Sequence, residues 1–407
     1  MPQLNHIVLI TSGQPSLNPR LVKEADTLAD AGYRVTVLYA YWNDWGTEID
    51  NDLIISKKWK AIRFGGDPVN EQWTYFFSRL IHKLAKIINQ KVSNKLMRDS
   101  AIARPAQSLM RGAAKIDADL YIGHNLGALP ATLKAAKMHK RPCGFDAEDF
   151  HRNEVSDDNN KPDVILKSTI ENLYIPMVDY LSVSSPLIAE EYMKIFPSVK
   201  PQVILNVFPQ AQDVKPPVIN NETAVRLFWF SQTIGINRGL EEVLSVLEQL
   251  TKDSFELHLL GHLSVEGDKM LSGRSLNVRI HDPIPPNDIP AFASQFDIGL
   301  ATENSTPLNR DICLTNKIFS YMQAGLAIVA SDTTAQKQLL AEYPAIGKLY
   351  LKNNFKSLAD TLGFYHIHRN ELFEARRAAL TVAKSKLNWE NESTKFLNIV
   401  KQTLNKN

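Results

Sequence analysis

A regular alternation of short apolar runs with segments of helical spacing constrains this fold most. Residues 6–10 read HIVLI and residues 34–40 read RVTVLYA, and both runs are typical of buried strands. Between them, Leu17, Leu21, Ala25 and Leu28 predict a helix over 16–31 that ends before Gly32. A strand, a helix and a strand in so few residues predict a βαβ unit.

The same alternation continues along the chain and is interrupted once. Further strands are expected at 53–56, 61–64, 119–125, 142–150, 179–184, 202–206, 226–231, 255–261, 277–282, 297–303 and 326–332. Helices are expected at 71–98, 128–139, 165–175, 186–195, 239–250, 287–296, 316–325 and 391–404. The interruption, residues 209–224, contains three prolines and little apolar content, so we interpret it as a linker.

A chain of 407 residues is too long for one ordinary core, which fits two α/β domains. We predict an N-terminal domain at 1–208 and a C-terminal domain at 225–389, with a last helix at about 390–407 that packs back on the first domain. Each domain should be a doubly wound, Rossmann-like parallel sheet. A ligand is expected in a cleft between the domains, at the carboxyl ends of the strands.

Composition excludes several classes of protein. Hydrophobic residues make up 44% and charged residues 22%, a globular balance, and the net charge of +2 argues against nucleic acid as a partner. Cys143 and Cys313 suit neither a disulfide framework nor a metal site, which favours a reducing, cytoplasmic location. We interpret residues 1–10 as a strand and not as a signal peptide, and no apolar run approaches a membrane span.

Three polar segments follow predicted strands. The first, TSGQPSLNPR (11–20), has only Gly13 where a dinucleotide-binding loop needs three glycines, which argues against a nicotinamide or flavin enzyme. Gly13 still permits close approach of a bulky substrate, and the following helix N-terminus favours an anion. The alternative is an ordinary loop shaped by Pro15 and Pro19.

The second segment, FSQTIGINRGLEEVL (230–244), places Arg238 before a helix, where a guanidinium could bind a diphosphate. The third, LTNKIFSYMQAGLAIVASD (314–332), places Thr315 as a helix N-cap, followed by Asn316 and Lys317, and Gly325 at the helix end. Two helix N-termini and two cations suit a nucleoside diphosphate leaving group. The alternatives are a solvated Arg238 and a surface Lys317.

The order of these segments resembles the retaining glycosyltransferases of family 4, which have the GT-B fold, over nearly the whole chain. The resemblance also includes ADLYIGHNLGALPATLKAA, FDAEDFH, VDYLSVSSPLIAEEY, ILNVFP, LLGH, DIGLA and NWE. It implies an N-terminal acceptor domain, a C-terminal nucleotide-sugar domain, and catalytic roles for His124, Arg238 and Lys317. Implied donor-binding residues are Gly13, Gly235, Arg238, Gly261, Thr315, Asn316, Lys317 and Ser320, and implied acceptor-binding residues are Gln14, Asn18, Asp146 and Glu148.

The chain departs from the family pattern where paired glutamates are usual. Their positions hold Ile312 and Ser320, with Asp311 adjacent, and a further basic position holds Gln232. The expected function is transfer of a hexose from a nucleotide-sugar to a glycan or lipid-linked acceptor, as in polysaccharide biosynthesis, with retention of configuration. Two alternatives stay open: an inactive GT-B module that serves as a binding subunit, and a sugar-nucleotide epimerase or hydrolase.

The expected mechanism needs neither a metal nor a cofactor. No carboxylate pair can be placed as acid and nucleophile, so we expect front-face attack with the departing phosphate oxygen taking the proton. Asp117-Ala118-Asp119 spells a short metal-nucleotide signature, but it precedes a strand, and we expect it on the surface. Glu171, in a predicted helix, is expected to be solvated.

Residues 73–98 carry an apolar stripe beside many cations. The stripe comprises Trp73, Phe76, Phe77, Leu80, Ile81 and Leu84, and the cations are Arg79, Lys83, Lys86, Lys91, Lys95 and Arg98. The pattern suits a helix on an anionic membrane surface, which would place the protein peripherally on the inner face of a membrane. It equally suits a helix that covers its own sheet, and for the aromatic residues we favour this core packing.

Overall fold

The computed structural model describes residues 4–91, 94–219, 224–250 and 254–406. It consists of two compact α/β units, Met1–Ile204 with Ser393–Asn407, and Leu205–Glu392, which we call the first and second domains. The predicted linker, 209–224, falls inside the second unit, and its residues 220–223 lie outside the described residues.

The first domain is built on a seven-stranded parallel sheet in the order β3-β2-β1-β4-β5-β6-β7. Its strands are β1 (His6–Thr11), β2 (Arg34–Ala40), β3 (Lys60–Phe64), β4 (Leu120–His124), β5 (Cys143–Ala147), β6 (Tyr180–Val183) and β7 (Gln202–Val203). Since β1 pairs with β2 on one side and β4 on the other, the strand order reverses between β1 and β4. Ligands of doubly wound sheets bind at such a reversal.

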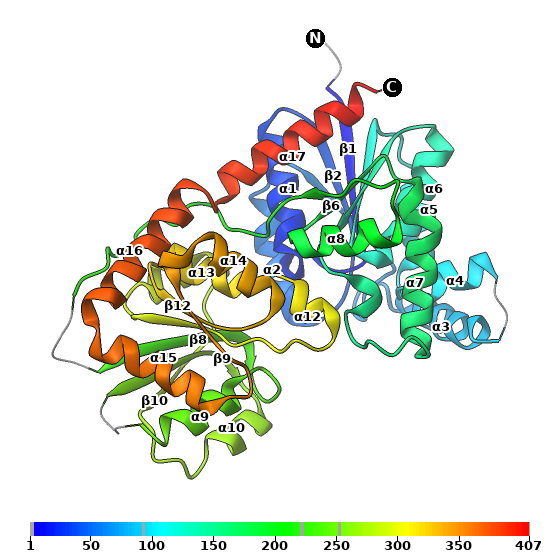
Figure 1. The fold of residues 1–407 in the computed structure, drawn as a ribbon. Helices are drawn as coiled ribbons and strands as arrows, with labels where there is room; N and C mark the ends of the chain where they lie inside the picture. The colour runs from blue at the N-terminus through cyan, green and yellow to red at the C-terminus, as the bar shows by residue number, and fades with distance from the viewer. Residues whose placement is uncertain (1–3, 92–93, 220–223, 251–253, 407) are drawn as a thin grey trace. The chain divides into compact units, whose positions relative to one another are not determined.

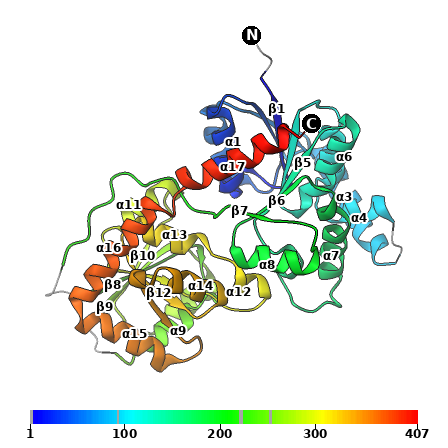
Figure 2. The same ribbon diagram turned by 45° about the horizontal axis from the view of Figure 1, so that its top comes forward.

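Helices cover both faces of this sheet, as right-handed crossovers require. They are η1 (Pro15–Leu17), α1 (Pro19–Asp30), α2 (Asp44–Ile55), α3 (Gln72–Asn89), α4 (Lys95–Ala101), α5 (Ala106–Ala113), η2 (Leu126–Ala128), α6 (Leu129–His139), η3 (His151–Asn153), α7 (Pro162–Tyr174), η4 (Ile175–Met177) and α8 (Pro186–Ile195). Figures 1 and 2 show α1 on one face and α5, α6 and α7 on the other.

The second domain repeats the plan with a six-stranded parallel sheet in the order β10-β9-β8-β11-β12-β13. Its strands are β8 (Val225–Ile234), β9 (Phe255–Leu263), β10 (Val278–His281), β11 (Ile298–Ala301), β12 (Ala327–Ser331) and β13 (Gly347–Tyr350). Here the order reverses between β8 and β11. The predicted fold, two doubly wound parallel-sheet domains, is therefore confirmed.

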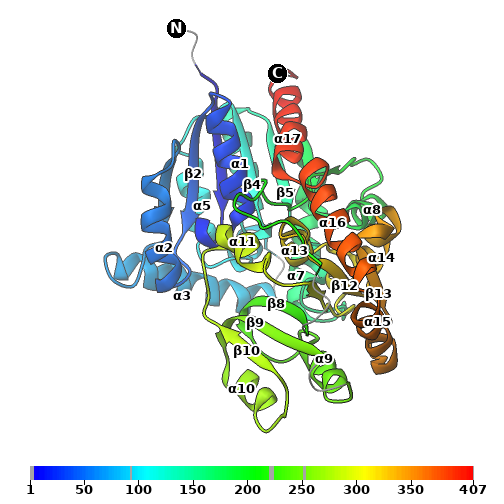
Figure 3. The same ribbon diagram turned by 90° about the vertical axis from the view of Figure 1, so that its left-hand side faces the viewer.

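The helices of the second domain also lie on two faces, and Figure 3 shows α9 and α15 on one side of the sheet and α13 and α16 on the other. The bounds are α9 (Leu240–Leu247), α10 (Val265–Leu271), η5 (Pro286–Asp288), α11 (Ile289–Ala293), α12 (Leu308–Ile312), α13 (Asn316–Gln323), α14 (Thr334–Glu342), η6 (Pro344–Ile346), α15 (Phe355–Ile367), α16 (Arg369–Ser385) and α17 (Trp389–Leu404). From Ser393 onward α17 belongs to the first domain, where Phe396 and Val400 are fully buried.

The apolar runs of the sequence form the two cores. Residues 7–10 of β1 are completely buried, as expected of a central strand covered on both faces. In the second domain, Trp229 of β8 lies in a core with Leu244 of α9 and Leu362 of α15. In each domain, these buried residues fix the carboxyl ends of the central strands, where the candidate site residues of that domain lie.

Residues 53–56, predicted as a strand, instead end helix α2 (Asp44–Ile55). Asn43 starts this helix, since its side chain accepts a hydrogen bond from the backbone N–H of Gly46. The run of Leu53, Ile54 and Ile55 is only the last turn of that helix. The β-propensity of a short run is therefore overridden by a capped helix that begins well before it.

Two predicted helices are interrupted in the structure. The helix expected over 16–31 starts at Pro19, with Asn18 as its N-cap, after a separate 3-10 turn. The helix expected over 71–98 is divided into α3, which ends at Asn89, and α4, which starts after the cap residue Asn94. Residues 92–93 of that prediction lie outside the described residues. Asparagine and proline both favour helix starts, which explains each division.

Candidate active site

In the first domain, candidate site residues lie where the strand order reverses between β1 and β4. The side chain of Asn125, directly after β4, donates to Thr11 Oγ1 at 2.9 Å and accepts from Ser12 Oγ at 2.7 Å. These bonds hold the loop after β1 in place. A Cβ added at Gly13 would meet no atom within 4 Å, so the backbone is open to a ligand at this position.

Gln14 and Asn18, expected to bind an acceptor, are both buried and both used in local structure. Gln14 donates to Thr47 and Asp50 and accepts from the backbone N–H groups of residues 42 and 43. Asn18 accepts from the backbone N–H of Leu21 and so caps α1. Each side chain therefore already shapes the loop that carries Gly13.

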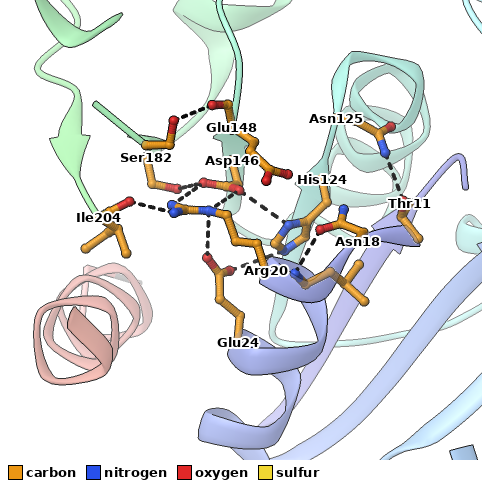
Figure 4. Close-up of polar contacts among 12 residues, drawn as sticks. Thr11, Asn18, Arg20, Glu24, His124, Asn125, Asp146, Glu148, Ser182 and Ile204 are labelled. Carbon is orange, nitrogen blue, oxygen red and sulfur yellow. Dashed lines mark hydrogen bonds and ion pairs between the residues drawn. The ribbon is translucent and has the colours of Figure 1, made fainter. Parts of the chain in front are cut away.

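A buried network of charged groups lies beneath this loop (Figure 4). Arg20 is fully buried and binds Asp146 through two hydrogen bonds, Nε to Oδ2 at 2.7 Å and Nη2 to Oδ1 at 2.8 Å. Its Nη1 donates to the carbonyl oxygen of Ile204, and Ser182 donates to Asp146 Oδ1. The pKa of Asp146 is held well below its usual value, because Arg20 and His124 outweigh the opposing effect of burial.

His124 ends β4 inside the same network and is only 1% exposed. Its Nε2 lies 3.2 Å from Glu24 Oε2, and its Nδ1 lies 3.5 Å from Asp146 Oδ2. Burial alone would lower the pKa of His124, but Glu24 and Asp146 outweigh burial and raise this pKa to about 9. His124 therefore lies buried between two carboxylates that favour its protonated form.

Glu148 follows β5 and is half-buried. Desolvation, together with the charge of Asp149, raises the pKa of Glu148 to about 7. The first domain thus brings Gly13, His124, Asp146 and Glu148 to one edge of its sheet. Sequence reasoning missed Arg20 and Glu24, although their spacing of four residues within a predicted helix was a usable signal.

Glu171 was expected to be solvated, and this prediction is wrong. The side chain is fully buried, accepts from the backbone N–H and the guanidinium of Arg152, and accepts from Tyr192 at 2.8 Å. Hydrogen bonds to a cation and a phenol satisfy this buried carboxylate. It fixes the loop that follows Glu148, outside the candidate site itself.

In the second domain, candidate site residues lie where the strand order reverses between β8 and β11. Arg238 is exposed, and its Nη1 lies 3.1 Å from Ser231 Oγ, while its carbonyl oxygen accepts from Thr302 at 3.0 Å. Gly239 follows at φ +79° as the N-cap of α9, and a Cβ there would lie 2.6 Å from Thr302 Cβ. Close packing of the two strand ends therefore sets Arg238 at the start of the helix.

Lys317 lies in the first turn of α13 and pairs with a carboxylate that sequence reasoning missed. Its Nζ lies 2.7 Å from Glu303 Oε1, just after β11, and 5.2 Å from the ring centre of Trp229. Thr315 occupies the predicted N-cap position, but its hydroxyl points to Glu303 Oε1 at 3.3 Å and makes no capping bond. The Thr315 side chain therefore does not occupy the backbone N–H groups at the start of α13, where the helix end favours an anion.

The other residues that were expected to bind the donor differ in how deeply they are buried. Asn316 is half-buried at the start of α13, Gly235 is buried in the loop after β8, and Ser320 is 2% exposed inside α13. Gly261 is structurally required, since its φ is +146° and a Cβ would lie 2.1 Å from the carbonyl oxygen of Ser231.

The family that the sequence resembles usually has glutamates at two positions that hold Ile312 and Ser320 here, so neither position supplies a carboxylate. Ile312 is buried, and Asp311 accepts hydrogen bonds from the backbone and hydroxyl of Thr334, while Gln232 is exposed. Glu303 supplies a carboxylate from a different strand end. Sequence reasoning predicted the strand over 297–303 but assigned its last residue no role.

The Asp117-Ala118-Asp119 signature lies at the opposite, amino-terminal edge of the first sheet. There Asp119 accepts from the backbone N–H of His6 at 2.8 Å, which is a structural role. Within the described residues, no group of three or more His, Cys, Asp or Glu side chains could hold a metal ion.

Part of the sequence matches a known family model. Residues 241–398 match the family model described as glycosyl transferase-like. No curated protein matches the chain in sequence. Most of the second domain is therefore similar in sequence to glycosyl transferase-like proteins.

Solved structures reproduce the architecture over almost the entire chain. Sucrose-phosphate synthase from Thermosynechococcus elongatus is similar with a TM-score of 0.72 at 12% identity, covering 99% of this chain and 100% of that one. HepE from Anabaena in complex with UDP-glucose is similar with a TM-score of 0.70 at 13% identity, covering 98% and 100%. S. aureus TarM in complex with fondaparinux, α-GlcNAc-glycerol and UDP gives a TM-score of 0.68 at 12% identity, covering 97% and 99%.

Proposed function

We propose that this protein is a glycosyltransferase that moves a hexose from a nucleotide-sugar to a glycan or lipid-linked acceptor, with retention of anomeric configuration. The glycosyl transferase-like match over 241–398 and the GT-B fold support this class. Because solved relatives contain UDP and UDP-glucose, uridine diphosphate sugars are the first donors to test.

The observation that carries the proposal is the pairing of two cations with two helix starts in the second domain. Arg238 precedes α9 and Lys317 lies in the first turn of α13. Helix α9 follows β8, and α13 comes after β11, the neighbour of β8 in the sheet. Such an arrangement suits the two phosphates of a nucleotide-sugar, since backbone N–H groups and cations both stabilise oxyanions. We assign Gly235, Thr315, Asn316 and Ser320 to the surroundings of the same donor.

The proposed chemistry forms one bond and breaks another on the same face of the sugar. The acceptor hydroxyl oxygen bonds to the anomeric carbon as the bond from that carbon to the diphosphate oxygen breaks. The departing phosphate oxygen takes the hydroxyl proton. Arg238 and Lys317 stabilise the charge that develops on the diphosphate, which is the step they accelerate.

The first domain is proposed to bind the acceptor at the edge that carries Gly13 and Glu148. The open backbone at Gly13 admits a sugar ring, and Glu148, with its pKa of about 7, can accept or donate a hydrogen bond to a hydroxyl. His124, enclosed by Glu24 and Asp146, acts as a positioning residue that holds the loops on either side. Neither a metal nor a cofactor enters this scheme.

The two alternatives predict different products. An epimerase or hydrolase consumes the donor without an acceptor, and an inactive binding module consumes none. The inactive binding module is favoured by one feature of the sequence, which is that positions 312 and 320 lack carboxylates. Glu303, which pairs with Lys317, supplies a carboxylate from a different strand end.

Thermal unfolding in the presence of nucleoside diphosphates and nucleotide-sugars tests the proposal first, since a ligand of the folded state raises Tm. We expect Arg238→Ala and Lys317→Ala to abolish this shift and to lower turnover by about a hundredfold. Arg377→Ala and Lys356→Ala, at exposed positions of the same domain, are the matched controls. Full activity of both site variants would overturn the proposal, and donor consumption without transfer would favour the hydrolase.

A further inference from the structure

Helix α3 is amphipathic, but its apolar face points away from the domain. Figure 1 shows α3 and α4, in cyan, at an outer edge of the first domain. The exposed apolar side chains of α3 are Trp73, Phe76, Phe77, Leu80, Leu84, Ile87 and Ile88. Trp73 is 76% exposed and Phe76 is 55% exposed, so the predicted core packing of these aromatic residues is wrong.

The opposite face of α3 is the one that packs on the protein. Ala85 and Ser78 are buried there, and Ser78 donates to the carbonyl oxygen of Gly65. His82 Nδ1 lies 3.2 Å from the carbonyl oxygen of Ser100. Small and polar groups thus face inward while seven large apolar groups face outward, the reverse of a helix that covers its own sheet.

The charges beside this face are all positive. Residues 72–98 contain six lysines and arginines and no aspartate or glutamate, although the whole chain has a net charge of only +2. Lys83, Lys86, Lys91 and Lys95 are exposed, and the Arg79 guanidinium lies over the Tyr75 ring. An apolar face with aromatic residues and flanking lysines is the composition of a helix that lies in a membrane interface.

We propose that the α3 face, defined by the seven apolar residues above, docks the first domain on an anionic lipid bilayer. The apolar side chains enter the boundary between headgroups and acyl chains, and the lysines contact anionic headgroups. Among the residues that the structure describes, none of the helices has the length and apolar character needed to span a bilayer. In the proposed contact, α3 lies along the membrane surface. A second copy of this chain is a poorer occupant, because a symmetric contact would bring like charges together.

Vesicle co-sedimentation tests the inference, with phosphatidylcholine vesicles compared with vesicles containing about one quarter phosphatidylglycerol. We expect binding to the anionic vesicles at about 50 mM salt and much weaker binding at about 300 mM salt. Lys83→Gln with Lys86→Gln should weaken vesicle binding by about tenfold to thirtyfold, since each lysine near the surface contributes to binding. Lys134→Gln with Lys137→Gln, exposed at the same spacing on α6, is the matched control.

Phe76→Glu tests the contribution of the apolar side chains, and it should lower binding to anionic vesicles by more than tenfold. Its control is Phe355→Glu, at an exposed position of the second domain. The inference does not depend on the proposed function, and nucleotide-induced Tm shifts should be equal in all these variants. Three results would each overturn it: no binding of the natural chain to anionic vesicles, equal losses in variants and controls, or a dimer in light scattering that Phe76→Glu dissociates.

Discussion

Lys317 and Glu303 form a short ion pair, with Nζ and Oε1 2.7 Å apart, between the start of α13 and the loop after β11. Both side chains are largely buried, with 13% and 15% exposure. The pair holds the lysine at the helix start and balances its charge. A diphosphate that approaches Lys317 must therefore share this cation with Glu303.

This relationship predicts the effect of Glu303→Gln. Because the substitution removes a negative charge beside the proposed diphosphate site, the affinity for a nucleoside diphosphate should rise by about threefold to tenfold. Isothermal titration calorimetry measures this change, with Glu266→Gln, an exposed glutamate of α10, as the control. A loss of nucleotide affinity would show instead that Glu303 binds the nucleotide directly.

Two glycines near strand ends should respond differently to alanine. At Gly13 a Cβ meets nothing in the protein, so Gly13→Ala should leave Tm within about 1 °C of the natural chain. Turnover should still fall by about tenfold or more, because the methyl group displaces a substrate from its aligned position. Gly261→Ala should instead lower Tm strongly, since its Cβ would collide with the backbone of Ser231. Unchanged activity of Gly13→Ala would exclude a substrate at that position.

His124 should stay protonated far above neutral pH. Its folded-state pKa of about 9 exceeds the value of about 6.5 for an unfolded histidine, so its ion pairs stabilise the folded state fully below about pH 6.5. That stabilisation is lost as the pH rises through about 9. Imidazole NMR shifts followed against pH measure the titration directly, and a midpoint below 7 would contradict the network.

Arg20→Met tests the buried network through stability. Without the guanidinium, Asp146 is a buried carboxylate whose remaining partners among the described residues are His124 and Ser182. We expect a loss of about 3–5 kcal/mol in the free energy of unfolding. Urea denaturation measures it. Lys356→Met, which removes an exposed ion pair with Asp360, should have little effect. Similar losses for the two variants would mean that the network adds no particular stability.

The central strands and the end of α13 could be predicted because the local residue pattern and the tertiary packing favour the same structure at these positions. The run at 6–10 is apolar and β-branched, and it becomes a fully buried strand. Gly325, predicted to end a helix, follows α13 at φ +69°. The location of Arg238 and Lys317 at one edge of the second sheet could be predicted from the strand ends alone, because the carboxyl ends of parallel strands meet at the same edge.

Features that depend on partners distant in sequence were not predictable. Glu171 has the helical surroundings of a solvated glutamate, and only Arg152 and Tyr192 bring it inside. Glu303 closes a predicted strand, but its role depends on Lys317. The outward orientation of Trp73 follows from the small residues on the opposite face of α3, whereas hydrophobicity alone suggests burial.

The central claim, that the second domain binds a nucleoside diphosphate between the starts of α9 and α13, is tested most directly by a crystal structure with UDP bound. We expect the two phosphates within hydrogen-bond reach of Arg238, Lys317 and the backbone N–H groups at the start of α13. In that structure the Lys317 Nζ should move from Glu303 toward a phosphate oxygen. Phosphates bound elsewhere, with the Lys317–Glu303 pair intact, would contradict the account.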